Sequence, residues 1–153
     1  MISKAKLGPS LQGLFVAVVL LLDVVSAAGY RSTKSATVNA RSGPGQRYKL
    51  LYTYSVRHFP LRVLKEYHGW SYVQDIAGDF SWVSSSLLCD VSTAITQYAC
   101  VMYKDPQARK IFAYVRANSV VSVKSVDGEM AKCAYRGKVG YIKKNVLWGI
   151  EAK

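Results

Sequence analysis

The sequence is poor in the residues that build disulfide frameworks, metal sites and catalytic pairs. Its 153 residues include three cysteines, two histidines, four prolines and only nine acidic residues. Neither His58 nor His68 has the spacing to a cysteine that zinc ligands require, so we expect no metal and no cofactor. So few cysteines exclude a disulfide-dense miniprotein, and their odd number leaves at least one thiol outside any intramolecular pair.

The shortage of acidic residues leaves a strongly basic chain. Twenty-one lysines and arginines against nine acidic residues give a formal net charge of +12, which favours anionic partners. Apolar residues make up 50% of the chain and charged residues only 20%, so the chain is expected to be globular and not disordered.

An apolar run near the N-terminus has the features of a targeting signal. Two lysines precede the apolar stretch Leu14–Leu22, and small residues follow it. This order is typical of a secretory signal peptide, whereas Asp23 makes the run too short for the roughly 20 apolar residues of a membrane span. We therefore expect cleavage of residues 1–28, with a retained membrane anchor as the alternative. The mature chain would be periplasmic or secreted, with a net charge of +11 from 19 basic and 8 acidic residues.

After residue 28, no window of the sequence shows a sustained helical period. Short runs rich in Val, Leu, Tyr and Trp recur between Gly, Pro, Asp and Asn, a pattern that predicts an all-β chain. The expected strands are residues 36–41, 50–54, 61–67, 71–76, 80–83, 98–103, 111–115, 120–126, 131–135 and 139–142. Residues 29–35 are expected to form a mobile polar lead.

The strands fall into two groups that repeat each other at a separation of about 60 residues. Leu61 corresponds to Val121, and the segment 82–88 corresponds to 141–147. Two tandem copies of one small barrel explain this order better than a single sandwich of ten strands. The expected domains are a first barrel at residues 36–89, a linker at 90–97, and a second, divergent barrel at 98–150.

Three ordered motifs stand in the first half: VNARSGPG at residues 38–45, GWSYV at 69–73 and SWVSSSLL at 81–88. Together they resemble the bacterial SH3-like (SH3b) domain family, with Ser81 in place of the usual glycine of the closing motif. The second half is more divergent, since Met130 stands where the turn tryptophan would be. Its ending, residues 140–149, resembles the final segment of exported two-domain SH3-like proteins of bacteria. The resemblance implies two tandem small SH3-like barrels after the signal peptide.

Aromatic residues crowd the first half and suggest a ligand groove. Tyrosine and tryptophan are enriched at binding surfaces because they offer large, stiff contact areas with a polar tip. The alternative is that several of these rings fill the small barrel core, and Trp82 is the residue most expected to do so. The candidate ligand-binding residues are Arg41, Tyr48, Tyr52, Tyr67, Trp70 and Tyr72.

The cysteines allow several interpretations. Cys100 and Cys133 fall at apolar strand positions of the second barrel, where a disulfide between them is expected if their Cα atoms come within about 4.4 to 6.8 Å. A link from Cys89 to Cys100, or free thiols, are the alternatives. Cys89 with a histidine could form a nucleophile pair, but both halves of the chain are used by barrels and leave no room for a catalytic domain.

These features favour a non-enzymatic, exported binding module of the bacterial cell envelope. Net charges of +5 for residues 29–89 and +6 for residues 90–153 indicate a general attraction to an anionic envelope and not one basic site. The expected partner is peptidoglycan, through its stem peptides, or another anionic envelope polymer; nucleic acid is disfavoured by export. An exported protein, with the chain as a scaffold or inhibitor, is the alternative partner, and a small cysteine-dependent hydrolase is the least favoured function.

Overall fold

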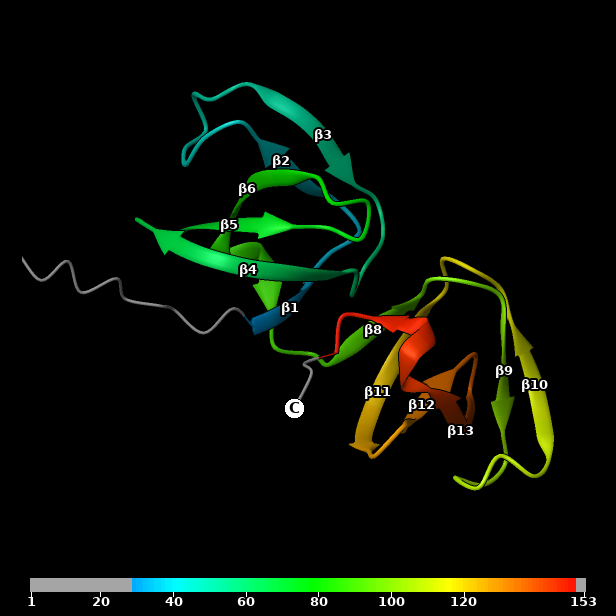
Figure 1. Cartoon of the computed structure of the whole chain (residues 1–153). Coiled ribbons are helices and arrows are strands. Elements are labelled where there is room, and N and C mark those ends of the chain that lie inside the picture. The colour runs from blue at the N-terminus through cyan, green and yellow to red at the C-terminus, as the bar shows by residue number, and fades with distance from the viewer. Residues whose placement is uncertain (1–28, 151–153) are drawn as a thin grey trace, which may run out of the picture.

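The computed structural model describes residues 29–150, so the expected signal peptide at residues 1–28 lies outside the described residues. Within 29–150 the chain has no α-helix, and therefore no helix long and apolar enough to cross a membrane. Two seven-stranded antiparallel sheets follow one another along the chain, each curled into a small barrel (Figure 1). The predicted all-β fold with two tandem barrels is confirmed.

The first barrel contains seven strands and one short 3-10 helix. They are β1 (Gly29–Thr33), β2 (Val38–Arg41), β3 (Leu50–Tyr54), β4 (Pro60–Tyr67), β5 (Trp70–Gln74), β6 (Phe80–Ser84), η1 (Ser85–Leu87) and β7 (Leu88–Cys89). The strands lie in the order β3-β2-β6-β5-β4-β1-β7.

The second barrel has the same elements in the same succession. They are β8 (Thr93–Thr96), β9 (Cys100–Tyr103), β10 (Ile111–Val115), β11 (Val120–Asp127), β12 (Met130–Tyr135), β13 (Lys138–Lys143), η2 (Lys144–Val146) and β14 (Leu147–Trp148). Their order, β10-β9-β13-β12-β11-β8-β14, is that of the first sheet with every strand number raised by seven. The two barrels are therefore two copies of one topology.

A buried threonine makes the same hydrogen bonds in both copies. Thr33 Oγ1 donates to the carbonyl oxygen of Val56 at 2.7 Å and accepts from the N–H of Phe59 at 2.9 Å. Thr96 Oγ1 makes the same two bonds, at 2.7 Å and 3.0 Å, to the equivalent loop before β11. Each threonine thus fixes the first strand of its barrel to the loop that leads into the long central strand.

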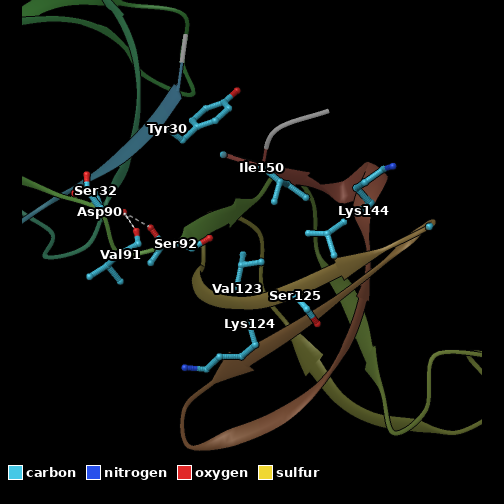
Figure 2. Close-up of a pocket in the computed structure, with 14 residues that line it drawn as sticks. Tyr30, Ser32, Asp90, Val91, Ser92, Val123, Lys124, Ser125, Lys144 and Ile150 are labelled. Carbon is cyan, nitrogen blue, oxygen red and sulfur yellow. Dashed lines mark hydrogen bonds between the residues drawn. The ribbon is translucent and has the colours of Figure 1, made fainter. Parts of the chain in front are cut away.

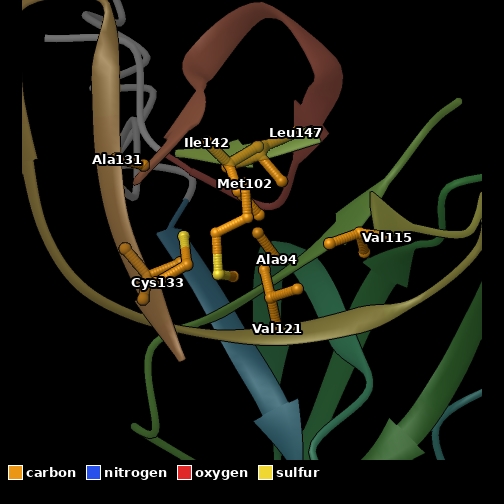
Figure 3. Packing of buried hydrophobic residues seen from close by; sticks show 9 residues of the cluster. Ala94, Met102, Val115, Val121, Ala131, Cys133, Ile142 and Leu147 are labelled. Carbon is orange, nitrogen blue, oxygen red and sulfur yellow. The ribbon is translucent and has the colours of Figure 1, made fainter. Parts of the chain in front are cut away.

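Each barrel has its own apolar core. The first consists of Val38, Ala40, Tyr54, Leu61, Val73, Val83 and Leu88. The second consists of Ala94, Met102, Val115, Val121, Val123, Ala131, Cys133, Ile142 and Leu147, with the Met102 side chain at its centre (Figure 3). Cores of this size give small domains only marginal stability, so the loss of one buried group is a large part of the free energy of unfolding.

The structure corrects two predicted domain boundaries. Residues 29–35 are expected to be a mobile lead, yet residues 29–33 form β1, which pairs with β4 and β7. The expected linker 90–97 likewise contains β8, which pairs with β11 and β14. Both strands bury serine and threonine side chains whose hydroxyls are hydrogen-bonded, so they lack the apolar alternation that identifies a strand in a sequence.

The structure also differs from the predicted Cys100–Cys133 disulfide, because all three cysteines are free thiols. Cys133 is fully buried in the second core. Burial, and secondly the negative charge of the Cys100 thiolate, raises the pKa of Cys133 to about 12. Burial also raises the pKa of Cys100. Both side chains therefore pack as small apolar groups in the barrel.

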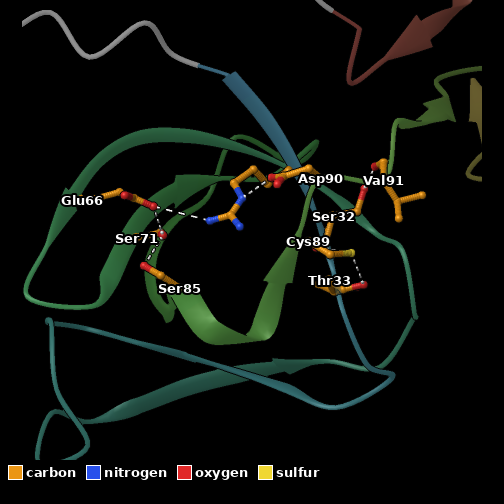
Figure 4. Close-up of polar contacts among 9 residues, drawn as sticks. Ser32, Thr33, Glu66, Ser71, Ser85, Cys89, Asp90 and Val91 are labelled. Atoms are coloured by element: carbon orange, nitrogen blue, oxygen red, sulfur yellow. Dashed lines mark hydrogen bonds and ion pairs between the residues drawn. The ribbon is translucent and has the colours of Figure 1, made fainter.

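Polar contacts connect the two barrels where β1 meets β8. The hydroxyl oxygens of Ser32 and Thr93 lie 2.6 Å apart, and the Thr93 hydroxyl donates to the carbonyl oxygen of His58 at 2.8 Å. Beside them, Arg31 Nε donates to Asp90 Oδ1 at 2.8 Å (Figure 4). These contacts hold the short connection between the barrels against the first barrel.

Candidate functional site

The outer face of the first sheet has a row of aromatic and cationic side chains that crosses four strands. The cross-strand partners are Arg41 with Trp82, Trp82 with Tyr72, and Tyr72 with Lys65. Partners in antiparallel strands point to the same face, and their neighbours along β5 and β6 are buried in the core, so these side chains face outward. We call Arg41, Lys65, Tyr72, Phe80 and Trp82 the aromatic–cationic row.

The rings of this row contact one another. The ring centroids of Tyr72 and Trp82 lie 5.1 Å apart, and Phe80 stacks on Tyr72 with a centroid distance of 5.8 Å and an interplanar angle of 19°. The Nζ atom of Lys65 lies 5.2 Å from the Tyr72 centroid and 5.5 Å from the Trp82 centroid. A cation over an exposed ring contributes about 0.5–1 kcal/mol, so the lysine and the rings hold one another in place.

Arg41 provides the positive charge at the β2 end of the row. Its Nη1 donates to the carbonyl oxygen of Tyr48 at 2.9 Å, and no other acceptor in residues 29–150 contacts this guanidinium. The Tyr48 ring packs against the preceding loop, where a Cβ added to Gly43 would overlap the ring. Tyr48 therefore orients Arg41 through its backbone, while the remaining guanidinium N–H groups are available to a ligand.

Tyr67 and Trp70 extend the outer face beyond the row. They are cross-strand partners at the β4–β5 hairpin, and Trp70 lies two residues before Tyr72, which places both on the outer face. The hairpin turns at His68 and Gly69 with φ values of 45° and 78°, as a type I′ turn requires. Tyr67 is 55% exposed. Four of the six predicted residues (Arg41, Tyr67, Trp70 and Tyr72) thus share this face.

Two aromatic residues point to the opposite side from the one predicted. Tyr52 lies on the inner side of β3, packs against the first core and meets the Tyr54 ring edge-on, so it does not join the outer face. Trp82 is expected in the core but lies on the outer face, because Val83 occupies the inward position of β6. Lys65 is not predicted from the sequence, since a β-bulge between Val63 and Lys65 decides which residue pairs with Tyr72.

A cleft of about 540 Å³ lies between the two barrels (Figure 2). Tyr30 lines it from the first barrel, and Lys124 and Lys144 line it from the second. Lys144 forms an ion pair with Glu129 at 3.7 Å, and Asp90 at the other side pairs with an arginine of β1. Asp90 and Lys144 of this cleft therefore already have partners of opposite charge. Arg41 and Lys65 of the aromatic–cationic row form no ion pair within residues 29–150.

The Cys89 thiol contacts the backbone, and the two histidines lie in turns. Cys89 Sγ donates to the carbonyl oxygen of Ser32 at 3.4 Å. His58 and His68 occupy tight turns with positive φ, and no hydrogen bond within residues 29–150 joins a histidine to a cysteine. The same part of the chain contains no group of three or more His, Cys, Asp or Glu side chains that could hold a metal ion.

Comparisons with known proteins identify the first barrel. Residues 34–90 match the family described as Bacterial SH3 domain, and no curated protein matches the chain. The solved structure of NlpC2 from Trichomonas vaginalis is 22% identical with a TM-score of 0.36, over 79% of this chain and 47% of that one. NlpC1 from the same organism is 21% identical with a TM-score of 0.35, over 78% and 45%. The chain spans about half the length of the solved structures it matches. The family match at residues 34–90 includes β2 to β7, so the first barrel has the sequence pattern of a bacterial SH3 domain.

Proposed function

We propose that this protein is a non-enzymatic binding module of the bacterial cell envelope and that the aromatic–cationic row binds its ligand. The row itself carries the proposal. Its adjoining rings offer an apolar surface, with the charge of Lys65 over the Tyr72 and Trp82 rings and the charge of Arg41 at the β2 end. A short peptide with free carboxylates fits this pattern, since its apolar part stacks on the rings while the carboxylates pair with the cations. Peptidoglycan stem peptides have this chemistry.

The family and the charge of the chain support an envelope ligand. Bacterial SH3 domains are usually cell-wall binding modules and usually lie outside the cytoplasm. The net charge of +12 attracts the chain to any polyanionic surface, and the row then supplies contacts at short range. Export through the N-terminal residues 1–28, to the periplasm or the medium, is part of this proposal.

The arrangement of the thiols supports a function without catalysis. A cysteine nucleophile needs a neighbouring base to form its thiolate. Cys89 instead donates its S–H to backbone carbonyl oxygens of β1. Selective labelling of Cys89 by a thiol-reactive activity probe would contradict this part of the proposal.

Cosedimentation with purified sacculi tests the ligand and the site together. We expect the unmodified protein to be retained, and Tyr72→Ala and Trp82→Ala each to lower the affinity about tenfold, because a stacked ring contributes about 1.4 kcal/mol to such contacts. Tyr98→Ala is the matched control, since Tyr98 is 66% exposed but lies outside the row.

Two outcomes would overturn the proposal. If the unmodified protein is not retained, the envelope ligand is wrong; if Tyr98→Ala reduces retention as much as Trp82→Ala, the row is not the site. Crosslinking in intact cells that captures an exported protein and no wall material would favour the scaffold or inhibitor function.

A further inference from the structure

A second hollow, of about 400 Å³, lies in the second barrel between β10 and the β12–β13 hairpin. Its volume is within the range of about 300–1,000 Å³ that small-molecule sites occupy. The residues that line it are Ala113, Tyr114, Arg116, Tyr135, Arg136 and Lys138.

One residue that lines the hollow is small where the first copy has a tyrosine. Ala113 pairs with Met102 and Tyr52 pairs with Ala40, each next to the β-bulge of its strand pair. The strand registers therefore equate Ala113 with Tyr52 and Val115 with Tyr54. In the first barrel the two tyrosine rings contact each other at 5.3 Å between centroids and fill this space. In the second barrel, Ala113 lines the hollow, while Val115 is buried in the core.

The hairpin beside this space has opposite charge in the two copies. In the first barrel the β5–β6 loop contains Asp75 and Asp79, and Asp75 Oδ1 accepts two backbone N–H groups of that loop at 2.9 and 3.1 Å. In the second barrel, the equivalent β12–β13 hairpin has Arg136 in its turn and Lys138 at the start of β13. The second copy therefore has a smaller residue in place of Tyr52 and the opposite charge in the hairpin beside it.

The cations around the hollow have no acidic partner in the described chain. Every ion pair formed within residues 29–150 involves other side chains. Arg136 lies 5.4 Å from the Tyr135 centroid, and Lys138 lies 5.5 Å from the centroid of Phe112. Tyr114 is 80% exposed. Unpaired cations held beside aromatic rings complement a ligand that has both an anionic group and a ring with an apolar face.

We propose that this hollow binds an acidic saccharide. The sugar ring lies against Tyr114 and Tyr135, and its carboxylate or phosphate lies between Arg116, Arg136 and Lys138. The site lies on the other barrel from the aromatic–cationic row and shares no residue with it. The saccharide site therefore holds or fails independently of the function proposed for the first barrel.

An NMR titration of the backbone amide signals tests the site. The probes are glucuronate and glucose 6-phosphate, with glucose and inorganic phosphate as separate arms. We expect saturable shifts at residues 113–116 and 135–138 with at least one acidic sugar, and at least tenfold weaker binding of glucose and of phosphate alone. The comparison of the two acidic sugars shows whether the acid is a carboxylate or a phosphate.

Matched variants separate this site from general attraction by a basic protein. Arg136→Gln with Lys138→Gln is expected to raise the Kd of the acidic sugar at least tenfold. Lys132→Gln with Lys143→Gln lowers the net charge equally, but both lysines lie outside the lining of the hollow, so this control keeps the affinity.

A third variant fills the space directly. Ala113→Tyr introduces the residue of the first copy and is expected to abolish binding if the barrel remains folded. If it does not fold, the two charge variants decide. The proposal is overturned if neither acidic sugar shifts the residues of the hollow, or if the two charge variants lose affinity equally.

Discussion

Replacing the buried threonine of either barrel by valine would remove one hydroxyl while keeping the shape of the side chain. Thr33 Oγ1 and Thr96 Oγ1 each make two hydrogen bonds to backbone groups, at 2.7 and 2.9 Å in the first barrel and at 2.7 and 3.0 Å in the second. The change leaves a carbonyl oxygen and an N–H without these partners. Both threonines are fully buried.

The expected loss of stability follows from these two bonds. A lost hydrogen bond costs about 1 kcal/mol, and a group that stays buried without a partner costs up to about 3 kcal/mol. Each of Thr33→Val and Thr96→Val should therefore lower the free energy of unfolding of its barrel by about 2–4 kcal/mol. For a domain of this size, every 1 kcal/mol corresponds to roughly 4–8 °C in Tm, so the fall should exceed about 8 °C.

Scanning calorimetry measures this fall, and amide hydrogen exchange assigns it to one barrel. Thr53→Val is the control, because Thr53 is exposed and its hydroxyl bonds only to the Asn39 side chain at 3.0 Å. The control should change stability by less than about 0.5 kcal/mol. If Thr33→Val and Thr96→Val are as mild as the control, the claim that these hydroxyls fix β1 and β8 in place is refuted.

Three further predictions concern packing, the thiols and the junction of the barrels. Gly140→Ala should destabilise the second barrel by about 1–3 kcal/mol in urea unfolding, because the new Cβ would lie 2.6 Å from Met102 Cγ; an unchanged midpoint would contradict the packing. Cys133 should resist alkylation at pH 8 and react only in denaturant, since its pKa of about 12 leaves almost no thiolate; mass mapping of native protein checks this. Thr93→Val should let the barrels tumble more independently in 15N relaxation, because its hydroxyl contacts both Ser32 and the backbone of His58.

The central strands could be predicted because they carry β-branched and aromatic runs between turn residues. The expected ranges 50–54 and 111–115 coincide with the observed bounds of β3 and β10. The predicted repeat at an offset of about 60 residues agrees with the structure, since Leu61 and Val121 occupy the same place in β4 and β11. Periodicity and turn chemistry are local signals, which a single sequence contains.

The first strand of each barrel could not be predicted, for a reason that lies in its partners. β1 (GYRST) and β8 (TAIT) contain polar residues whose burial is compensated by hydrogen bonds to distant loops, such as that of Thr33 to the carbonyl of Val56. The same limit applies to the site. Trp82 and Val83 are adjacent apolar residues, and only the pairing register of β6 decides which of them faces the core.

The two copies have kept one backbone and diverged in the chemistry that they present. Where the first has Trp82 and Tyr72 paired on its outer face, the second has Tyr141 and Lys132. Where the first fills a space with Tyr52, the second leaves a cationic hollow. Net charges of +5 and +6 conceal this difference, because the same number of lysines and arginines can be spread evenly or gathered at one place. The sequence therefore predicts a general attraction to anions, whereas the strand registers place three of the second barrel's cations around one hollow. Specificity in this chain thus depends on where the registers place a charge and not on how many charges each barrel has.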